Sequence, residues 1–255
     1  MASLARPTYR FSLALVPSRD EIPLVLNARH MVGAGVEVGV QRGAYSEYLL
    51  ERWGGACLIS VDPWLAQDPE RYVDVANVPQ AEQERNLAIT SERLARFGGR
   101  SVIWRTTSVE AARRVDDGAL DFVYLDARHD FDSVTEDLTL WFPKLRWAGI
   151  LAGHDYYDGV FQEGIYGVKS AVELFAAGHG LRVYSTYQDR WPSWLTVKGG
   201  RERGSRILPL DAGARAMLLL LRSGAARVRR STMGTEPRPS WKATTTETGR
   251  RPRRT

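Results

Sequence analysis

The sequence predicts an α/β fold, a mostly parallel sheet with helices on both faces. Strand-like and helix-like segments alternate from about residue 30 to residue 199, as they do in βαβ units. The third to fifth strand segments are short apolar or β-branched runs, as expected for strands covered on both sides. The expected strands are residues 35–40, 57–61, 101–105, 122–125, 150–153, 181–185 and 194–197. The expected helices are residues 45–53, 80–97, 109–115, 134–145 and 168–177.

Segments outside this alternation have different compositions. Residues 1–29 are interpreted as an N-terminal extension or cap and residues 30–199 as the folded domain. The leucines within 200–222 favour a short C-terminal helix. Residues 223–255 are rich in Arg, Pro, Thr and Ser, which predicts a basic disordered tail. Insertions at 65–78 and 156–167 follow the second and fifth strands, at the sheet edge where ligands bind, so we expect both to contact ligands.

The net charge of +5 is unevenly distributed along the chain. Residues 201–255 carry 14 basic and 4 acidic side chains, whereas the remaining residues carry 21 basic and 26 acidic ones. Only the tail would attract a polyanion, and a solvated extension is favoured over a nucleic-acid-binding arm. No signal peptide precedes the domain, no apolar run approaches the roughly 20 residues of a membrane span, and Cys57 is the single cysteine. A soluble cytoplasmic protein is expected.

The stretch GVEVGVQRGAYSEYLL, residues 35–50, predicts a cradle for a nucleotide-type cofactor. Its strand reaches Glu37, its turn carries Gly39 and Gly43, and the next strand ends in Asp62. Small residues let the backbone approach a ligand, and the helix start offers free N–H groups. A carboxylate closing the next strand is placed to accept hydrogen bonds from a ribose diol. The dinucleotide fingerprint G-x-G-x-x-G is absent.

Acidic and histidine side chains follow the fourth and fifth strands. The fourth runs LDARHD, with Asp126 at its end and His129 just beyond, and the fifth runs LAGHD, with His154 and Asp155 at its end. The carboxylates that follow His129 are interpreted as the N-terminal cap and solvated acidic face of the next helix; they are Asp130, Asp132 and Asp137. Helix spacing also assigns four apolar residues to the core: Trp141, Phe142, Leu145 and Trp147.

The E-x-G-x-x-x-G pattern with a following acidic residue resembles the S-adenosylmethionine site of class I methyltransferases. The resemblance covers roughly residues 30–199 and implies a Rossmann-like, seven-stranded sheet whose last strand is antiparallel. It implies that the cofactor is S-adenosylmethionine and that the strand ends bearing Asp126 and Asp155 flank the reactive methyl group. Trp64 would stack on the adenine or simply pack. The cofactor-binding residues would be Glu37, Gly39, Gly43, Asp62, Trp64, Ser108 and Asp126.

A narrower resemblance is carried by LDARHDFDSVTEDLTLWFPKLRWAGILAGHDYYDG and GVKSAVELFAAGHG. These motifs are similar to those of small-molecule O-methyltransferases related to macrocin O-methyltransferase. By position, Asp126 and Asp155 would bind Mg²⁺ and His129 would be the general base. His154 stands where that group has an acidic residue. This departure weakens the preference for Mg²⁺ and admits Mn²⁺, Zn²⁺ or no metal.

The resulting hypothesis is an S-adenosylmethionine-dependent O-methyltransferase acting on a hydroxyl of a small molecule, such as a sugar or natural product. Its catalytic residues would be His129, Asp126 and His154, and its metal ligands Asp126, His154 and Asp155. A homo-oligomer is left open. One alternative is a metal-independent enzyme acting on another acceptor such as nucleic acid, although LDAR differs from the D/N-P-P-Y motif of base methylation. The other is a non-catalytic nucleotide-binding module.

Overall fold

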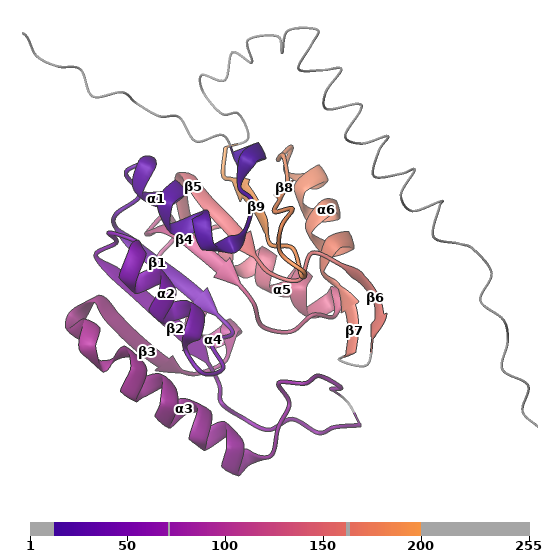
Figure 1. The fold of residues 1–255 in the computed structure, drawn as a ribbon. Helices are drawn as coiled ribbons and strands as arrows, with labels where there is room; N and C mark the ends of the chain where they lie inside the picture. Colours follow the sequence, from indigo (N-terminus) through magenta and orange to yellow (C-terminus); the bar gives the residue numbers. More distant parts are fainter. Residues whose placement is uncertain (1–12, 71, 162–163, 200–255) are drawn as a thin grey trace, which may run out of the picture. The chain divides into compact units, whose positions relative to one another are not determined.

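The computed structural model describes residues 13–70, 72–161 and 164–199, and a seven-stranded sheet organises them (Figure 1). Its strands are β1 Ala34–Val38, β2 Cys57–Asp62, β3 Ser101–Arg105, β4 Leu120–Leu125, β5 Leu145–Gly153, β8 Tyr184–Ser185 and β9 Trp194–Val197. The strand order is β3-β2-β1-β4-β5-β9-β8. Strands β1 to β5 pair in parallel, and β9 is antiparallel to both neighbours. The predicted fold class, including the antiparallel last strand, is confirmed.

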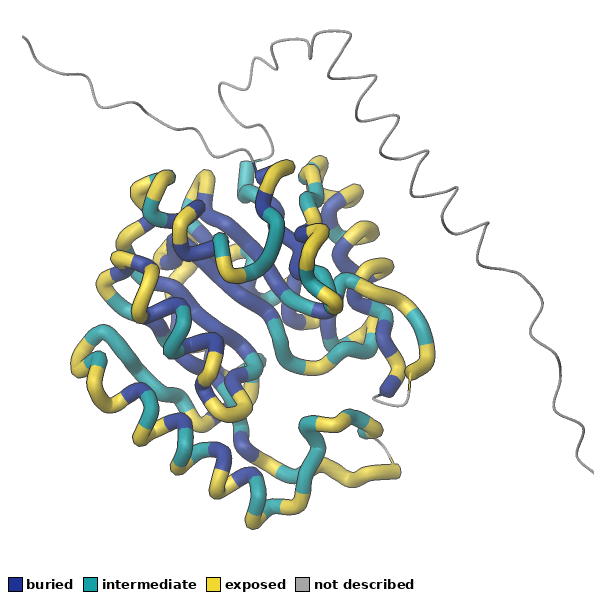
Figure 2. Tube along the Cα trace, in the orientation of Figure 1, coloured by how far each residue is buried: buried dark blue, intermediate teal, exposed yellow. Residues whose placement is uncertain are grey.

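Helices cover both faces of the sheet (Figures 1 and 2). They are α1 Ile22–Ala28, α2 Ala44–Arg52, α3 Gln80–Leu94, α4 Ser108–Ala112, α5 Phe131–Trp141 and α6 Val168–Gly178. Alternate residues of β4 belong to different cores, because successive strand side chains point to opposite faces. Phe122 and Tyr124 pack with residues of α1 and α2, whereas Val123 and Leu125 pack with residues of α4, α5 and α6. Both faces are therefore buried.

The second insertion, expected as a loop at 156–167, contains regular secondary structure. It contains a two-stranded antiparallel hairpin, β6 Asp158–Phe161 and β7 Gly164–Gly167. An isolated β-bridge joins Asp74 of the first insertion to Gly164 of this hairpin. The two insertions, about 90 residues apart in sequence, thus meet in space.

The described part of the N-terminal segment contributes to the core. Ile22 and Leu26 of α1 are fully buried and pack with the α2 face. The helix expected within 200–222 and the tail expected at 223–255 lie outside the described residues. In the part of the chain that the structure describes, no helix is long and apolar enough to cross a membrane.

Trp147 was expected in the core, and this prediction is wrong: 68% of it is exposed. The β4–β5 register jumps from the pair Leu120–Leu145 to the pair Phe122–Ile150. Residues 146–149 therefore bulge out of the ladder, with Ala148 at a positive φ of 62°. Trp147 lies in this strand bulge rather than at a helix end, so helix spacing did not apply.

The turn after β1 approaches the end of β4 so closely that it requires glycine. Gly39 has φ 88°, and a Cβ there would lie 2.0 Å from the carbonyl oxygen of Asp126. The Asp126 N–H donates to the Val38 carbonyl at 2.8 Å, and the Gly39 N–H donates to the Val61 carbonyl at 2.9 Å. These contacts fix the ends of β1, β2 and β4 relative to one another.

A buried polar chain links β1, α2 and β2 behind this turn. The Ser46 hydroxyl donates to the Glu37 carboxyl group, and the Ser60 hydroxyl donates to Ser46 Oγ at 3.0 Å. Glu37 is 1% exposed, and burial raises its pKa from 4.5 to about 8 despite the hydrogen bond from Ser46. Glu37 therefore carries a proton in the folded protein at neutral pH.

This proton makes stability depend on pH. Glu37 loses its proton near pH 4.5 in the unfolded chain but only near pH 8 in the folded protein. The contribution of this proton to the free energy of unfolding is therefore complete below pH 4.5 and is lost as the pH rises to about 8. The Glu37→Gln side chain does not ionise, so the free energy of unfolding of this variant should fall less over this range. The two slopes should differ by up to about 1.4 kcal/mol per pH unit. Urea unfolding at pH 5.5, 7.0 and 8.5 measures the difference. Parallel profiles for the two proteins would show that Glu37 ionises normally.

Candidate active site

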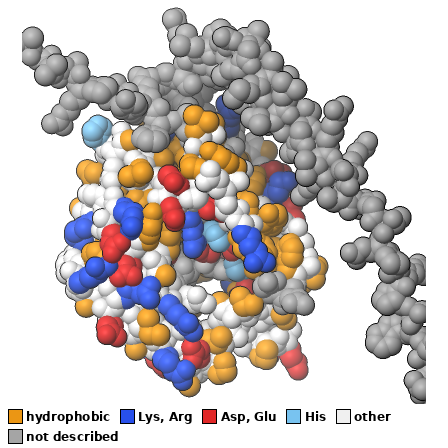
Figure 3. Space-filling view, in the orientation of Figure 1, with side chains coloured by type: hydrophobic (Ala, Val, Ile, Leu, Met, Phe, Trp, Pro, Cys, Tyr) orange, Lys and Arg blue, Asp and Glu red, His pale blue; other side chains and the backbone are white. Residues whose placement is uncertain are grey.

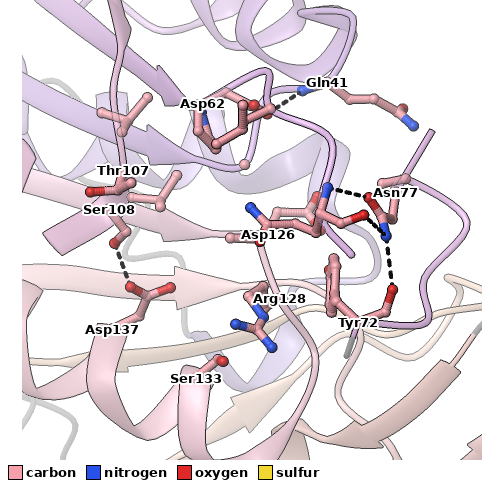
Figure 4. Close-up of a pocket in the computed structure, with 18 of the residues that line it drawn as sticks. Gln41, Asp62, Tyr72, Asn77, Thr107, Ser108, Asp126, Arg128, Ser133 and Asp137 are labelled. Carbon is pink, nitrogen blue, oxygen red and sulfur yellow. Dashed lines mark hydrogen bonds between the residues drawn. The ribbon is translucent and has the colours of Figure 1, made fainter. Parts of the chain in front are cut away.

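A cavity of about 290 Å³ opens at the carboxyl ends of the parallel strands (Figure 4). Its walls come from the ends of β1, β2 and β4, from the start of α4 after β3, from the first insertion and from α5. Of the residues expected to bind the cofactor, four line it: Gly39, Asp62, Ser108 and Asp126. This is the edge at which open parallel sheets bind ligands.

Asp62 holds the glycine turn in place at one wall of the cavity. Its Oδ2 accepts hydrogen bonds from the N–H groups of Val40 and Gln41, at 2.9 and 3.0 Å. Its Oδ1 accepts from the N–H of Trp64 at 2.7 Å. A carboxylate oxygen has two lone pairs, so acceptor capacity remains for a ligand diol.

The other three expected cofactor residues stand behind the cavity wall, not on it. Glu37 belongs to the buried chain with Ser46, and Gly43, at φ 70°, is the N-cap of α2. Trp64 has no exposed surface, and its indole N–H donates to the Gln41 carbonyl at 2.8 Å. Of the two roles expected for Trp64, the structure favours packing, because the buried ring supports the turn and none of it faces the cavity.

Several cavity residues were not predicted from the sequence. Asn77 and Tyr72 come from the first insertion, where the Asn77 amide donates to the Tyr72 carbonyl at 2.8 Å. The Arg128 guanidinium lies 4.5 Å from the centre of the Tyr72 ring. Asp137 comes from α5 and is only 7% exposed, so its assignment to a solvated acidic face is wrong. Its neighbours at i−3, i+1 and i+4 are the buried residues Val134, Leu138 and Trp141, and this apolar surrounding was the available signal.

A cluster of histidines and carboxylates forms beside this cavity, at the ends of β4 and β5. His129 contacts Asp74 from Nδ1 at 2.7 Å and Asp155 from Nε2 at 2.9 Å. His154 Nδ1 lies 2.9 Å from Asp155 Oδ1 and 3.7 Å from Asp126 Oδ1. The four residues expected to meet here do so, and Asp74 joins them from the first insertion.

The charges in this cluster bear on the predicted role of His129 as the base, which stays a prediction. Burial lowers the pKa of His129, but hydrogen bonds to Asp155 and Asp74 outweigh it and raise the pKa from 6.5 to about 10. At neutral pH the ring is an imidazolium with both N–H groups donated to carboxylates, so it has no free lone pair for a proton. The pKa of His154 is also raised, by Asp155 and Asp126 against the effect of burial. The pKa of Asp126 is raised chiefly by burial.

Arg19, from the N-terminal segment, reaches the same cluster. Its Nη1 lies 3.6 Å from Asp126 Oδ2, and its guanidinium is 4.8 Å from the centre of the Tyr45 ring. Its backbone is anchored on both sides, since its N–H donates to Asp189 at 2.9 Å and its carbonyl accepts from Tyr45 at 3.0 Å. The sequence had offered no signal for this residue, because its partner is more than 100 positions away.

The donor set of this cluster fits a divalent cation. Asp126, His154 and Asp155 each offer a ligand atom, and these atoms lie within 4.8 Å of one another. Two carboxylates and one imidazole suit Mn²⁺ or Zn²⁺ better than Mg²⁺, which prefers oxygen. Asp155 has a positive φ of 52°, which directs its carboxylate between the two histidines. Non-glycine residues in this uncommon backbone conformation are typical of functional sites.

Aromatic rings cover the far side of the cluster. Tyr166 of β7 stacks on His129 with ring centres 4.5 Å apart, and on Trp191 at 5.4 Å. Phe161 of β6 contacts both Tyr166 and Trp191 at 5.3 Å, and Tyr157 contacts Trp191 at 5.3 Å. Figure 3 shows histidine, acidic and basic side chains gathered near the middle of one face, with apolar side chains around them. The site thus has a polar centre and an aromatic edge.

Known proteins were compared with this chain. The model of the family described as methyltransferase domain matches residues 36–156, which run from β1 past the end of β5. No curated protein matches the sequence. Solved structures share the fold at low identity. An O-methyltransferase from Bacillus cereus in complex with SAH has a TM-score of 0.51 and 12% identity, covering 70% of this chain and 79% of that one.

Two further structures show how widely this fold is used. A proposed caffeoyl-CoA O-methyltransferase from Staphylococcus aureus has a TM-score of 0.53 and 13% identity, covering 71% of this chain and 82% of that one. A proposed rRNA methylase from Clostridium thermocellum has a TM-score of 0.50 and 14% identity, covering 72% and 98%. The matched segment contains the glycine turn, Asp62 and the Asp126 and Asp155 strand ends. The matched residues are just under half of the chain, and the structure has the fold of the class I S-adenosylmethionine-dependent methyltransferases.

Proposed function

We propose that this methyltransferase acts on a hydroxyl oxygen of a small molecule, such as a sugar or a natural product. The supporting observation is the cluster of Asp126, His154 and Asp155 immediately beside the cofactor cavity. Methyl transfer to oxygen requires removal of the hydroxyl proton and a fixed position for the oxygen, and charged groups at this place provide both.

Asp126 is the group placed to take the proton. It is the one member of the cluster that lines the cofactor cavity, so its carboxylate reaches both the methyl donor and the acceptor. The acceptor oxygen forms a bond to the methyl carbon while the C–S bond breaks and its electron pair stays on sulfur. The products are the methyl ether and S-adenosylhomocysteine, and the hydroxyl proton goes to Asp126.

His129 acts as a positioning residue in this proposal. Its imidazolium holds the carboxylates of Asp74 and Asp155 together, which ties the first insertion to the end of β5. The two carboxylates would otherwise repel one another in a partly buried site. Without His129, Asp155 would lose one of the two partners that orient it.

A divalent cation would be held by Asp126, His154 and Asp155. When bound, it would lower the pKa of a coordinated hydroxyl and fix the oxygen. The residues must accommodate it by a change of partners, because His154 now contacts Asp155 and Asp126, and Arg19 lies against Asp126. Metal binding should therefore release protons and compete with the Arg19 contact.

The acceptor is proposed to have a ring that packs on the aromatic edge. Tyr157 and Phe161 are each 38% exposed beside the cluster, so they offer ring faces and edges to a neighbouring molecule. Aromatic side chains bind the apolar faces of both phenols and sugar rings.

Radiolabelled S-adenosylmethionine tests the proposed function directly. The protein should methylate at least one member of a panel of sugars and phenols, and nuclear magnetic resonance should locate the new methyl on oxygen. A parallel panel of transfer and ribosomal RNA serves as the competing acceptor. Label found only in RNA, or on nitrogen or carbon, would refute hydroxyl methylation.

Asp126→Asn should separate chemistry from cofactor binding. The amide keeps the shape of the carboxylate but cannot accept the proton, so turnover should fall by about 100-fold or more. The affinity for S-adenosylhomocysteine, measured by calorimetry, should change by less than about threefold. Asp132→Asn, an exposed charge on the first turn of α5, is the matched control and should leave both values unchanged. Full turnover by Asp126→Asn would remove Asp126 from the chemistry.

Metal binding can be measured without an acceptor. Titration of the protein with Mn²⁺ should show one site by calorimetry, and Asp155→Asn should weaken it by about 10-fold or more because a charged ligand is lost. Arg19→Ala should tighten it, since the guanidinium no longer competes for Asp126. Chelator should lower turnover and Mn²⁺ restore it. Equal Mn²⁺ affinity in the wild type and Asp155→Asn would refute this site.

A further inference from the structure

One buried charge in the cavity has no part in the chemistry described above. Asp137 lies two turns into α5, is 7% exposed and lines the cofactor cavity. A carboxylate in such a place needs hydrogen-bond partners to offset the loss of water. Figure 4 shows that it points toward Ser108 at the start of α4, on the β3 side of the cavity.

The hydrogen bonds around Asp137 have a fixed direction. The indole N–H of Trp141 donates to Ser108 Oγ at 2.8 Å. An indole N–H is only a donor, so the Ser108 hydroxyl accepts from it and uses its own proton toward Asp137 Oδ1. Asp137 is thereby required to be an acceptor at Oδ1. Burial raises its pKa only to about 6, so at pH 8 the carboxylate is ionised and its other oxygen is also an acceptor.

The sheet order places the base of the cofactor at this end of the cavity. Asp62 ends β2 and is placed for the ribose, while Asp126, where the methyl is transferred, ends β4. In the strand order β3-β2-β1-β4, the end of β2 lies between the end of β3 and the end of β4. The base and the sulfur are attached to opposite sides of the ribose, so the base extends from Asp62 the other way, toward β3. Ser108 and Asp137 line the cavity on that side.

We propose that Asp137 is a specificity-determining residue that accepts a hydrogen bond from the 6-amino group of the adenine. The proposal rests on binding of the S-adenosyl cofactor in this cavity. A 6-amino group donates and matches a carboxylate, whereas a 6-oxo group accepts and would meet it with like polarity. The protein should therefore reject a 6-oxopurine cofactor.

Two cofactor products provide the test: S-adenosylhomocysteine and its 6-oxo analogue, S-inosylhomocysteine. Calorimetry at pH 8 should give at least about 10-fold tighter binding of the adenosyl compound to the wild type. In Asp137→Asn, the Ser108 hydroxyl still donates, so the amide oxygen faces Ser108 and the NH₂ faces the cavity. The acceptor is thus replaced by a donor, and the preference should disappear or reverse in favour of the inosyl compound.

Asp132→Asn is the matched control, because it removes the same charge from an exposed position on the same helix. It should keep the wild-type ratio of affinities. A wild-type ratio in Asp137→Asn would overturn the proposal. Failure of both compounds to bind the wild type would instead overturn the assignment of this cavity to the cofactor.

A measurement on the wild type alone covers the case in which Asp137→Asn does not fold. The N6,N6-dimethyl analogue of S-adenosylhomocysteine keeps the purine but has no N–H at position 6. It should bind at least about 10-fold more weakly than the parent compound. Equal affinities for the parent and both the dimethyl and inosyl analogues would overturn the proposal without any variant.

Discussion

The contact between Gly39 and the backbone of Asp126 is the constraint on which the site depends. A Cβ at residue 39 would lie 2.0 Å from the Asp126 carbonyl oxygen, so only glycine permits β1 and β4 to end at the same level. Asp62 then holds the same turn through Val40 and Gln41. One turn thus positions both the wall of the cavity and the carboxylate of Asp126, for which we propose the cofactor and acceptor roles. The glycine serves the close approach of two strands as well as the approach of a ligand.

The elements that sequence reasoning predicted are those set by local pattern. Strand and helix alternation and the strand ends at Asp62, Asp126 and Asp155 follow from periodicity and order, whereas the antiparallel last strand was implied by the family resemblance. The pairing of His129 with Asp74 was not predicted, for a different reason. Its proton is held by Asp74, 55 residues earlier, and pairing across that distance leaves no periodic signal. For Asp137 the signals in the sequence conflict. Its apolar neighbours on the helix indicated burial, but its own charged side chain indicated exposure to solvent.

The cluster beside the cavity is balanced in charge by the chain itself. The carboxylates of Asp74, Asp126 and Asp155 face Arg19 and the protonated ring of His129, with His154 between two of them. Burying so many charges is tolerable because each has an opposite partner within hydrogen-bonding or ion-pair distance. A cation bound at the proposed site would have to displace some of these partners, so it would compete with the protein's own positive groups for Asp126.

Asp74 connects the cavity to the hairpin at which the acceptor is proposed to bind. The first insertion lines the cavity through Tyr72 and Asn77, and the same insertion pairs with Gly164 of the β6–β7 hairpin. Between them, Asp74 holds His129, which stacks on Tyr166 of that hairpin. Order in one insertion therefore supports order in the other. A cofactor that packs against the first insertion should for this reason also stabilise the aromatic edge on which the acceptor is proposed to bind, which couples the two binding events through contacts of the folded chain.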